Sequence, residues 1–185
     1  MKRIIVALSM LLAGCSVGHY NIDGAAMNHA KMVFIGIPVI AGSQGTTTPI
    51  SATTSLTNKH VAEPMMKTVL KHHRSCDVAL IEQDNRGEDI SVSFKRANKG
   101  ETVNIFGYSA RSGMPVSSVG KVKGFRIVDG CMVGYTDAGS VQGMSGGPVL
   151  NSKGDIVGIF FAMDTKSGLS YFVPYQEFKS MIKGD

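Results

Sequence analysis

From residue 31 onward, the chain alternates between short apolar runs and small turn-forming residues. Val, Ile and Thr occur in runs of strand length, and Gly, Ser and Asn separate them. Residues 147–161, GPVLNSKGDIVGIFF, contain two such runs around a turn at residues 151–154, which is typical of a β-hairpin. The pattern predicts an all-β fold of many short antiparallel strands.

The expected strands fall into two groups that meet near residues 97–101. The last run, SYFVPYQEFKSMI, begins as a strand and turns helical after Pro174. Two small barrels side by side fit this count, with a first lobe over residues 31–97 and a second lobe with a short C-terminal helix over residues 98–185. A two-sheet sandwich fits the periodicity almost as well.

Residues 1–15, MKRIIVALSMLLAGC, have the basic start, apolar stretch and small-residue end of a secretory signal. The apolar stretch is too short to span a bilayer as a helix. Residues 12–15, LAGC, resemble the bacterial lipobox, which implies removal of residues 1–14 and lipidation of Cys15. An ordinary signal peptide, in which Cys15 is incidental, is the alternative. By the same resemblance, Ser16 favours the outer membrane, with the folded part facing the periplasm or the cell exterior.

Residues 16–29 are small and polar and show no clear periodicity. We therefore expect residues 15–30 to be a lipidated cysteine followed by a flexible tether. The net charge of +5 is mild, and no block of Lys and Arg is interleaved with aromatic residues, so nucleic-acid binding is not supported. No feature of the sequence indicates a particular oligomeric state.

Residues 143–148, GMSGGP, form the most informative motif. Acyl transfer needs an exposed hydroxyl with backbone N–H groups directed at the same point, and flanking glycines allow a substrate carbonyl to approach closely. Ser145 is the candidate nucleophile, and the N–H groups of Gly143 and Ser145 are the candidate oxyanion hole. The alternative is a simple Gly/Ser turn before the hairpin.

Two further motifs make a resemblance specific. Residues 56–61, LTNKHV, and residues 77–81, DVALI, precede the GMSGGP motif in the order His, Asp, Ser. All three resemble motifs of the chymotrypsin/trypsin-like serine proteases, closest to the bacterial glutamyl-endopeptidase and Deg-like branches. The resemblance covers residues 32–180 and implies a fold of two six-stranded β-barrels with a catalytic triad of His60, Asp77 and Ser145.

The chain also departs from that family. Few residues separate His60 from Asp77, so the first barrel must be trimmed. Met144 stands where digestive enzymes have an Asp that pairs with a freed N-terminus, so that kind of activation is not expected. By the same alignment, four residues line the primary substrate pocket, and none is acidic: Gly139, Ser140, Phe161 and Met163. We expect a preference for a small or medium uncharged side chain.

The remaining cysteines, Cys76 and Cys131, are candidates for a disulfide between the lobes, because thiols tend to pair in oxidising compartments. They could equally stay free, since the sequence gives no distance between them. The three cysteines include no C-x-x-C pair, so no metal site is predicted, and the expected reaction requires no cofactor.

The resulting hypothesis is a membrane-anchored serine endopeptidase acting on a peptide or protein substrate. The main alternative is a binding or immunity lipoprotein on the same fold, with weak or no catalysis. An envelope-assembly scaffold is a third, weaker hypothesis. The complete set of His60, Asp77 and Ser145 favours the enzyme, and the trimmed first lobe favours the binder.

Overall fold

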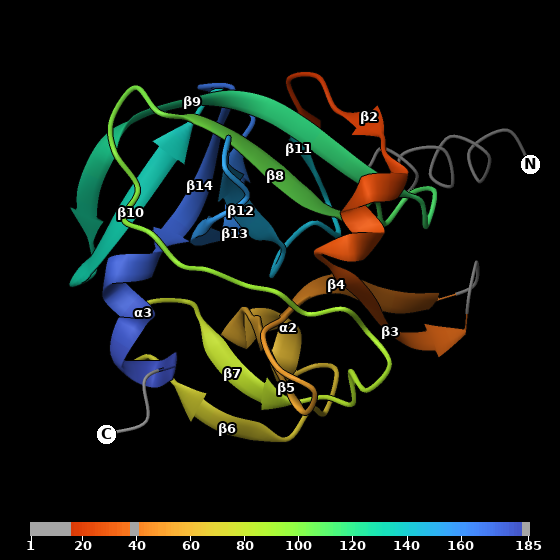
Figure 1. The fold of residues 1–185 in the computed structure, drawn as a ribbon. Helices are drawn as coiled ribbons and strands as arrows, with labels where there is room; N and C mark the ends of the chain where they lie inside the picture. Colours follow the sequence, from red (N-terminus) through yellow and green to blue (C-terminus); the bar gives the residue numbers. More distant parts are fainter. Residues whose placement is uncertain (1–15, 38–40, 183–185) are drawn as a thin grey trace, which may run out of the picture.

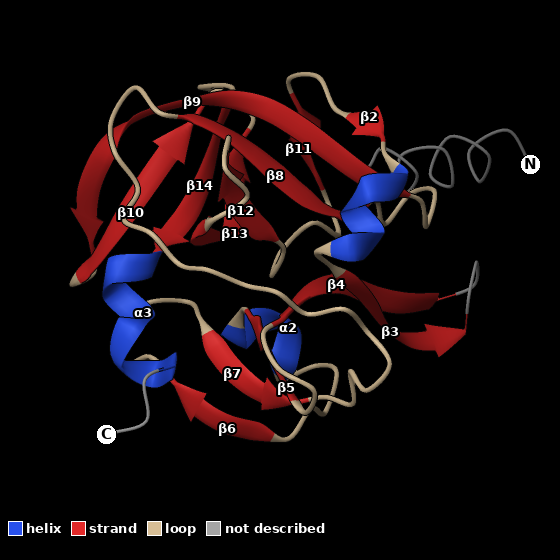
Figure 2. Ribbon diagram, viewed as in Figure 1, coloured by secondary structure: helices blue, strands red, loops and turns tan. Residues whose placement is uncertain are grey.

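The short strands assemble into two antiparallel β-units in the computed structural model, which describes residues 16–37 and 41–182 (Figure 1). The two units lie one above the other in this view, and the C-terminal helix covers one side of both. Strands dominate and helices are few and short (Figure 2). The expected double-barrel fold with a short C-terminal helix is confirmed.

The first unit is an open sheet of five strands in the order β3-β4-β5-β7-β6. Its edge strands β3 and β6 do not pair with one another, which agrees with the expected trimming of the first barrel. The short helix α2 (Lys59–Ala62) follows β5. The strands are β3 (Lys31–Ile37), β4 (Ala41–Pro49), β5 (Thr54–Thr57), β6 (Val69–His72) and β7 (Ala79–Glu82).

The second unit is a closed barrel of six strands. The order runs β10-β14-β13-β12-β8-β9, and pairing of β9 with β10 closes the ring. The predicted hairpin over residues 147–161 forms β12 and β13. The strands are β8 (Thr102–Tyr108), β9 (Pro115–Val128), β10 (Cys131–Thr136), β12 (Pro148–Asn151), β13 (Ile156–Asp164) and β14 (Leu169–Pro174).

A shared core joins the two units. Leu56 and Val78 of the first unit pack in one apolar cluster with second-unit residues, and α3 (Tyr175–Ile182) adds Phe178 to it. Phe178 is fully buried, and burial of a side chain of this size stabilises the fold by about 2–3 kcal/mol. The lobes are therefore held together by apolar packing as well as by the chain connection.

Cys76 and Cys131, the candidates for a disulfide, are bonded to one another across the two units. Their Cα atoms are 5.0 Å apart, and 55 positions separate them in the sequence. Cys76 immediately precedes Asp77, so the bond fixes the start of β7 to β10 of the second unit. The disulfide thus lies one residue from a predicted site residue.

The connection between the units over residues 89–97 forms no continuous strand, although its alternating residues suggest one. Only Phe94 forms a bridge there, to Ile156, and its ring stacks on Tyr175. The segment crosses from one unit to the other as an extended linker instead of joining the first sheet. Its polar residues 89, 91 and 93 have no continuous partner strand, which explains why local β-propensity was not enough.

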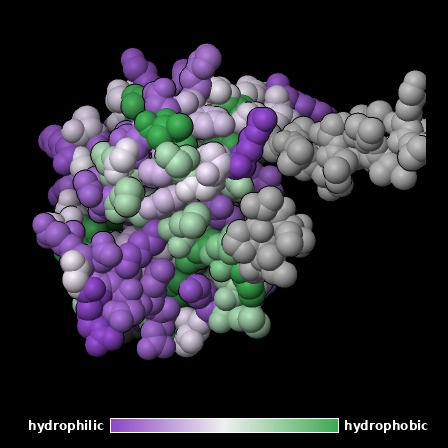
Figure 3. Space-filling model, turned by 90° about the vertical axis from the view of Figure 1, so that its right-hand side faces the viewer, coloured by the Kyte–Doolittle hydropathy of each residue, from purple (hydrophilic) through white to green (hydrophobic). Residues whose placement is uncertain are grey.

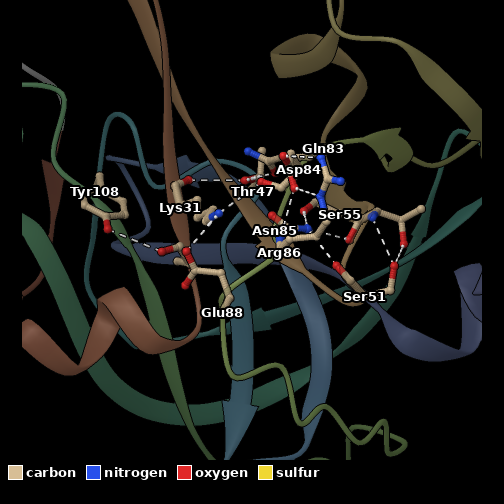
Figure 4. A network of polar contacts seen from close by, with 12 residues as sticks. Lys31, Thr47, Ser51, Ser55, Gln83, Asp84, Asn85, Arg86, Glu88 and Tyr108 are labelled. Carbon is tan, nitrogen blue, oxygen red and sulfur yellow. Dashed lines mark hydrogen bonds and ion pairs between the residues drawn. The ribbon is translucent and has the colours of Figure 1, made fainter.

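A polar network secures the beginning of this linker (Figure 4). The side-chain amide of Asn85 donates to the Ser51 carbonyl, the Thr54 carbonyl and the Ser55 hydroxyl at 2.9–3.1 Å. Lys31 of β3 pairs with Glu88 at 3.1 Å. These contacts attach the beginning of the linker to the β4–β5 turn and to the edge strand β3.

The N-terminal segment, expected as a flexible tether, is instead ordered against the second unit. β1 (Ser16–Val17) pairs with β11 (Ser140–Val141), and β2 (Asn21–Ile22) extends the barrel sheet beside β9. The short helix η1 (Gly24–Asn28) follows. Backbone pairing, the buried side chains of Val17 and Ala26, and Tyr20 against the barrel core hold this segment, and apolar residues this scattered gave no periodic signal.

The expected membrane-targeting segment precedes this ordered part of the chain. The predicted signal over residues 1–14 and the predicted lipidation site Cys15 lie outside the described residues. Within residues 16–37 and 41–182, none of the helices combines the length and the apolar character needed to cross a bilayer.

Candidate active site

His60 and Asp77 lie side by side at one end of the first sheet. β5 ends at Thr57, and the helix that begins two residues later carries His60. Asp77 precedes β7, and the pairing of Thr57 with Ala79 brings the start of β7 next to the end of β5. The His60 Nδ1 and Asp77 Oδ2 atoms are 2.5 Å apart, so the two side chains share a short hydrogen bond.

Backbone and side-chain amides hold the half-buried Asp77 in place. The N–H groups of Lys59 and His60 donate to its Oδ1 at 2.8 and 3.3 Å, and Asn58 donates to its carbonyl at 2.7 Å. Burial raises the pKa of Asp77, but the hydrogen bonds and charge of His60 and the bond from Lys59 outweigh it and hold the pKa below 3.8. The carboxylate is therefore ionised at neutral pH and accepts a hydrogen bond from the Nδ1–H group of His60.

Ser145 lies on the loop between β11 and β12 of the second unit. Gly146 follows it with a φ of +91°, and a Cβ there would collide with the Thr46 carbonyl, so only glycine fits. The hydroxyl of Thr48 donates to the Gly146 carbonyl at 2.9 Å. The loop conformation is thus set partly by the first unit.

Thr46 of β4 connects the Ser145 loop to the strand that leads to His60. Its N–H donates to the Ser145 carbonyl at 2.8 Å, and its own carbonyl accepts the Thr57 hydroxyl at 2.8 Å. Thr46 is therefore hydrogen-bonded both to Ser145 and to Thr57 at the end of β5. This arrangement places the predicted serine at the junction of the units, on the side where His60 leaves β5.

The Ser145 hydroxyl itself is directed toward Phe161. Its Oγ donates to the Phe161 carbonyl at 3.3 Å, and among residues 16–37 and 41–182 no hydrogen bond joins it to His60. Phe161 sits where the pairing of β13 with β14 shifts register, which leaves its carbonyl free for this contact. The structure thus joins His60 to Asp77 directly, and Ser145 to that pair only through the backbone around Thr46.

The N–H groups predicted to form an oxyanion hole have no acceptor within the described part of the chain. Gly143 has a φ of +99°, and neither its N–H nor that of Ser145 donates a hydrogen bond there. The Gly143 carbonyl accepts the buried Thr46 hydroxyl at 2.7 Å, and that hydroxyl also accepts the Tyr108 N–H at 3.2 Å. The Gly143 carbonyl is thus held by Thr46. Within the described ranges, the N–H groups of Gly143 and Ser145 have no acceptor.

Thr46 is the functional candidate that the sequence did not reveal. It is the first of three consecutive threonines, all fully buried, and lies outside every recognised motif. A run of buried hydroxyl groups requires partners, which is the one signal that could have indicated it. The partners themselves are distant in sequence and become visible only in the fold.

The residues expected to line the primary pocket occupy different environments. Gly139 packs on the backbone of His19, and Ser140 is buried with its hydroxyl 2.8 Å from that of Ser170. Phe161 packs against the shared core, and Met163 packs against the core of the barrel. Two surface cavities, of about 460 and 410 Å³, lie elsewhere and include none of these four residues.

One group of metal-ligand residue types occurs within the described ranges. His73, Cys76 and Glu177 have ligand atoms within 4.8 Å of one another. Cys76 is bonded to Cys131 and offers no thiolate, and His73 Nδ1 already accepts the Cys76 N–H at 2.9 Å. Because these atoms are already engaged, we interpret the group as part of the packing around the disulfide and not as a metal site.

Comparison with known proteins points to one family. Residues 40–159 match the family model described as a trypsin-like peptidase domain. No curated protein matches the sequence. Among solved structures, the active form of the Rv3671c protease from M. tuberculosis is similar, with a TM-score of 0.71, 20% identity, and coverage of 84% of this chain and 80% of that one.

Two further solved structures share the fold. The MamO protease domain from Magnetospirillum magneticum gives a TM-score of 0.67 at 21% identity, covering 86% of this chain and 98% of that one. The HtrA-type protease AlgW with a tripeptide gives 0.69 at 20% identity, covering 85% of this chain but 61% of that one. At these identities the structural likeness concerns the fold.

Proposed function

The chain belongs to the family of trypsin-like peptidase domains, and on this premise we propose that it is a serine endopeptidase anchored to a bacterial membrane. The observation that carries the proposal is the contact between His60 Nδ1 and Asp77 Oδ2, which fixes the orientation of the imidazole. A structural histidine would not need an ionised carboxylate that is itself held by two backbone amides.

In the proposed reaction, His60 Nε2 takes the proton of the Ser145 hydroxyl as the oxygen attacks a peptide carbonyl. The carbonyl π electrons move onto its oxygen, and His60 then donates the proton to the departing amine as the C–N bond breaks. The same imidazole then takes a proton from water as the water attacks the acyl carbonyl, and it returns the proton to Ser145 Oγ as the ester C–O bond breaks and the acid is released. Asp77 holds the Nδ1 tautomer and stabilises the imidazolium throughout.

The reaction requires a rotation of the Ser145 side chain. Its hydrogen bond to Phe161 is 3.3 Å long, which is weak for an O–H donor, so breaking it costs little. Catalytic hydrogen bonds often tighten only when substrate is bound. We propose that substrate binding shifts the hydroxyl from the Phe161 carbonyl to His60.

The oxyanion that forms during attack would be bound by the Gly143 and Ser145 N–H groups. Their lack of acceptors in the described residues supports this role, because a buried N–H normally has a partner. Removal of one such donor typically slows catalysis by about 10²–10³-fold.

For specificity, we propose a small or medium uncharged side chain at the cleaved bond. None of the residues Gly139, Ser140, Phe161 and Met163 carries a charge that could pair with Arg or Lys. The packing of Met163 against the barrel core supports a shallow pocket.

The location rests on the sequence motif at Cys15. We propose cleavage before Cys15, lipidation of its thiol and acylation of its amine, and attachment to the outer membrane with the folded part facing the periplasm or the cell exterior. Several acyl chains on one residue give stable anchoring, whereas a single chain is marginal.

A binding lipoprotein without catalysis is the second candidate. The observation that favours it is the direction of the Ser145 hydroxyl, which donates to Phe161 instead of His60. In that case, the cleft would hold a peptide without cleaving it.

Labelling of the full-length lipidated protein with a fluorophosphonate separates the two candidates. The proposal predicts covalent labelling that is lost in Ser145→Ala and strongly slowed in His60→Ala, because only an activated serine displaces fluoride at a useful rate. His72→Ala is a matched control, since His72 is exposed on β6 and has no role in the site. Absence of labelling in the wild type, with folding intact, would favour the binding lipoprotein.

A further inference from the structure

Four large apolar side chains are exposed within a short part of the N-terminal region. Ile22, Met27, Met32 and Phe34 are between 40% and 67% exposed. They come from three successive elements, β2, η1 and β3. Single exposed apolar residues are ordinary, but a group of this kind marks an interaction surface.

β3 shows that the exposure is not simply the outer face of an amphipathic strand. Val33 is buried and packs on Val61 and Met65, so its neighbours in the strand point outward. Those neighbours are Met32 and Phe34, at positions where a strand facing water normally carries polar residues. β3 is also an edge strand, with β4 as its only partner in the sheet.

The four residues and Met114 belong to one side of the molecule. Ile22 is paired with Val116, and the N–H of the next residue donates to the Pro115 carbonyl, which brings Met114 beside β2. β2, η1 and β3 all lie on the right in Figure 1, and Figure 3 looks onto that side and shows apolar residues gathered there. We call these five residues the anchor face.

The proposed lipidation site immediately precedes the docked segment that carries part of the anchor face. Ser16 pairs with Val141 and the buried Val17 pairs with Ser140, so the docked chain begins at the residue after Cys15. One extended residue spans at most about 3.6 Å, and the flexible spacer expected from the sequence is replaced by paired backbone from Ser16 onward. Lipid on Cys15 would therefore hold the folded body directly at the bilayer surface.

We infer that the anchor face rests on the membrane and inserts its apolar side chains into the interfacial region of a phospholipid bilayer. This inference rests on the proposed lipidation of Cys15. Exposed Arg111, in the loop that contains Met114, suits anionic headgroups. Three acids lie nearby. The carboxylate of Asp23 accepts the Ser117 hydroxyl at 2.6 Å and the Ala25 N–H at 2.9 Å, Glu88 pairs with Lys31 at 3.1 Å, and Asp89 lines a cavity beside Met27.

A single introduced tryptophan tests the inference, because the chain contains none. Full-length lipidated Phe34→Trp protein is reconstituted into vesicles of phosphatidylethanolamine and phosphatidylglycerol, with or without brominated acyl chains. Ile127→Trp is the matched control, since Ile127 is 78% exposed near the opposite end of β9. We expect brominated lipid to quench the fluorescence of the Phe34→Trp protein at least two-fold and to leave that of the Ile127→Trp protein unchanged.

Vesicle flotation distinguishes failure of the inference from failure of its premise. Phe34→Trp protein that floats with the vesicles while its fluorescence stays unquenched overturns membrane docking and leaves the anchor intact. Protein that does not float overturns both. Met32→Trp, on the same face of β3, serves as a second probe if Phe34→Trp does not fold, and fluorophosphonate labelling reports separately on the proposed catalysis.

Discussion

At the scale of single residues, the candidate site depends on a few hydrogen bonds, and those that position Ser145 come from Thr46, which lies outside the recognised motifs. The side chains of His60 and Asp77 are joined directly, whereas Ser145 is positioned through the backbone and hydroxyl of Thr46. Thr46 is therefore a positioning residue for the loop that carries the proposed nucleophile.

Thr46→Val should lower kcat/KM for a peptide substrate by about 10–100-fold, because the Gly143 carbonyl loses its donor and the loop is free to shift. It should also cost about 1–3 kcal/mol of unfolding free energy, since the Tyr108 N–H is left unpaired. Steady-state kinetics and denaturant unfolding measure the two effects.

Thr47→Val is the matched control for this experiment. The Thr47 hydroxyl is equally buried but bonds to Gln83 at 2.7 Å, away from the Ser145 loop. It should lose similar stability and keep kcat/KM, whereas Thr46→Ser should restore activity. Equal kinetic losses in Thr46→Val and Thr47→Val would remove the positioning role.

The lowered pKa of Asp77 leads us to predict how the stability of the protein depends on pH. Because its pKa in the folded state lies below 3.8, its stabilising contribution is complete above that value and is lost as the pH falls through the lower folded pKa. The difference in Tm between the wild type and Asp77→Asn should stay constant from pH 7 to about 5 and shrink below about pH 4. If the difference in Tm already shrinks close to neutral pH, another titrating group is responsible for it.

At the scale of elements, the three motifs proposed to be catalytic could be located in the sequence because each occupies the end of a strand or a glycine-rich turn with local chemistry of its own. The strands were predicted from the periodicity of apolar residues. The trimmed first sheet was predicted from the short stretch of sequence between His60 and Asp77. The docking of residues 16–28 could not be recognised, because it depends on backbone pairing with β9 and β11 and on a few scattered apolar residues without periodicity, namely Val17, Tyr20 and Ala26.

Ser118 connects the N-terminal segment to the loop before Ser145. Its buried hydroxyl donates to the His19 carbonyl and accepts the Gly139 N–H, both at 2.6 Å. Ser118→Ala should cost about 1–3 kcal/mol and raise amide hydrogen exchange in β1 and β11. Ser152→Ala, in an exposed turn, should change neither. Unchanged exchange in β1 would mean that other contacts hold the segment.

At the scale of the whole molecule, the two units are held together by a common apolar core, the linker and the disulfide. The candidate site residues come from both units, with His60 and Asp77 on the first and Ser145 on the second, so their relative positions depend on this connection. The disulfide is the covalent part of this connection, and it ends one residue from Asp77.

Replacing both cysteines by alanine should lower the unfolding free energy by about 2–4 kcal/mol, as expected for a loop of 55 positions. Activity should fall as well, since Asp77 loses its tie to β10. Denaturant unfolding with and without dithiothreitol tests this, because reductant should destabilise only the wild type. Equal sensitivity of both proteins to reductant would contradict the prediction.

The central claim is that Ser145 and His60 act as one catalytic unit, and a kinetic cycle on the full-length lipidated protein tests it most directly. Ser145→Ala, His60→Ala and the double variant should each lose on the order of 10⁴-fold or more in kcat/KM for a peptide substrate, with no further loss in the double variant. Losses that multiply in the double variant, or a Ser145→Ala protein that retains wild-type hydrolysis, would contradict the claim.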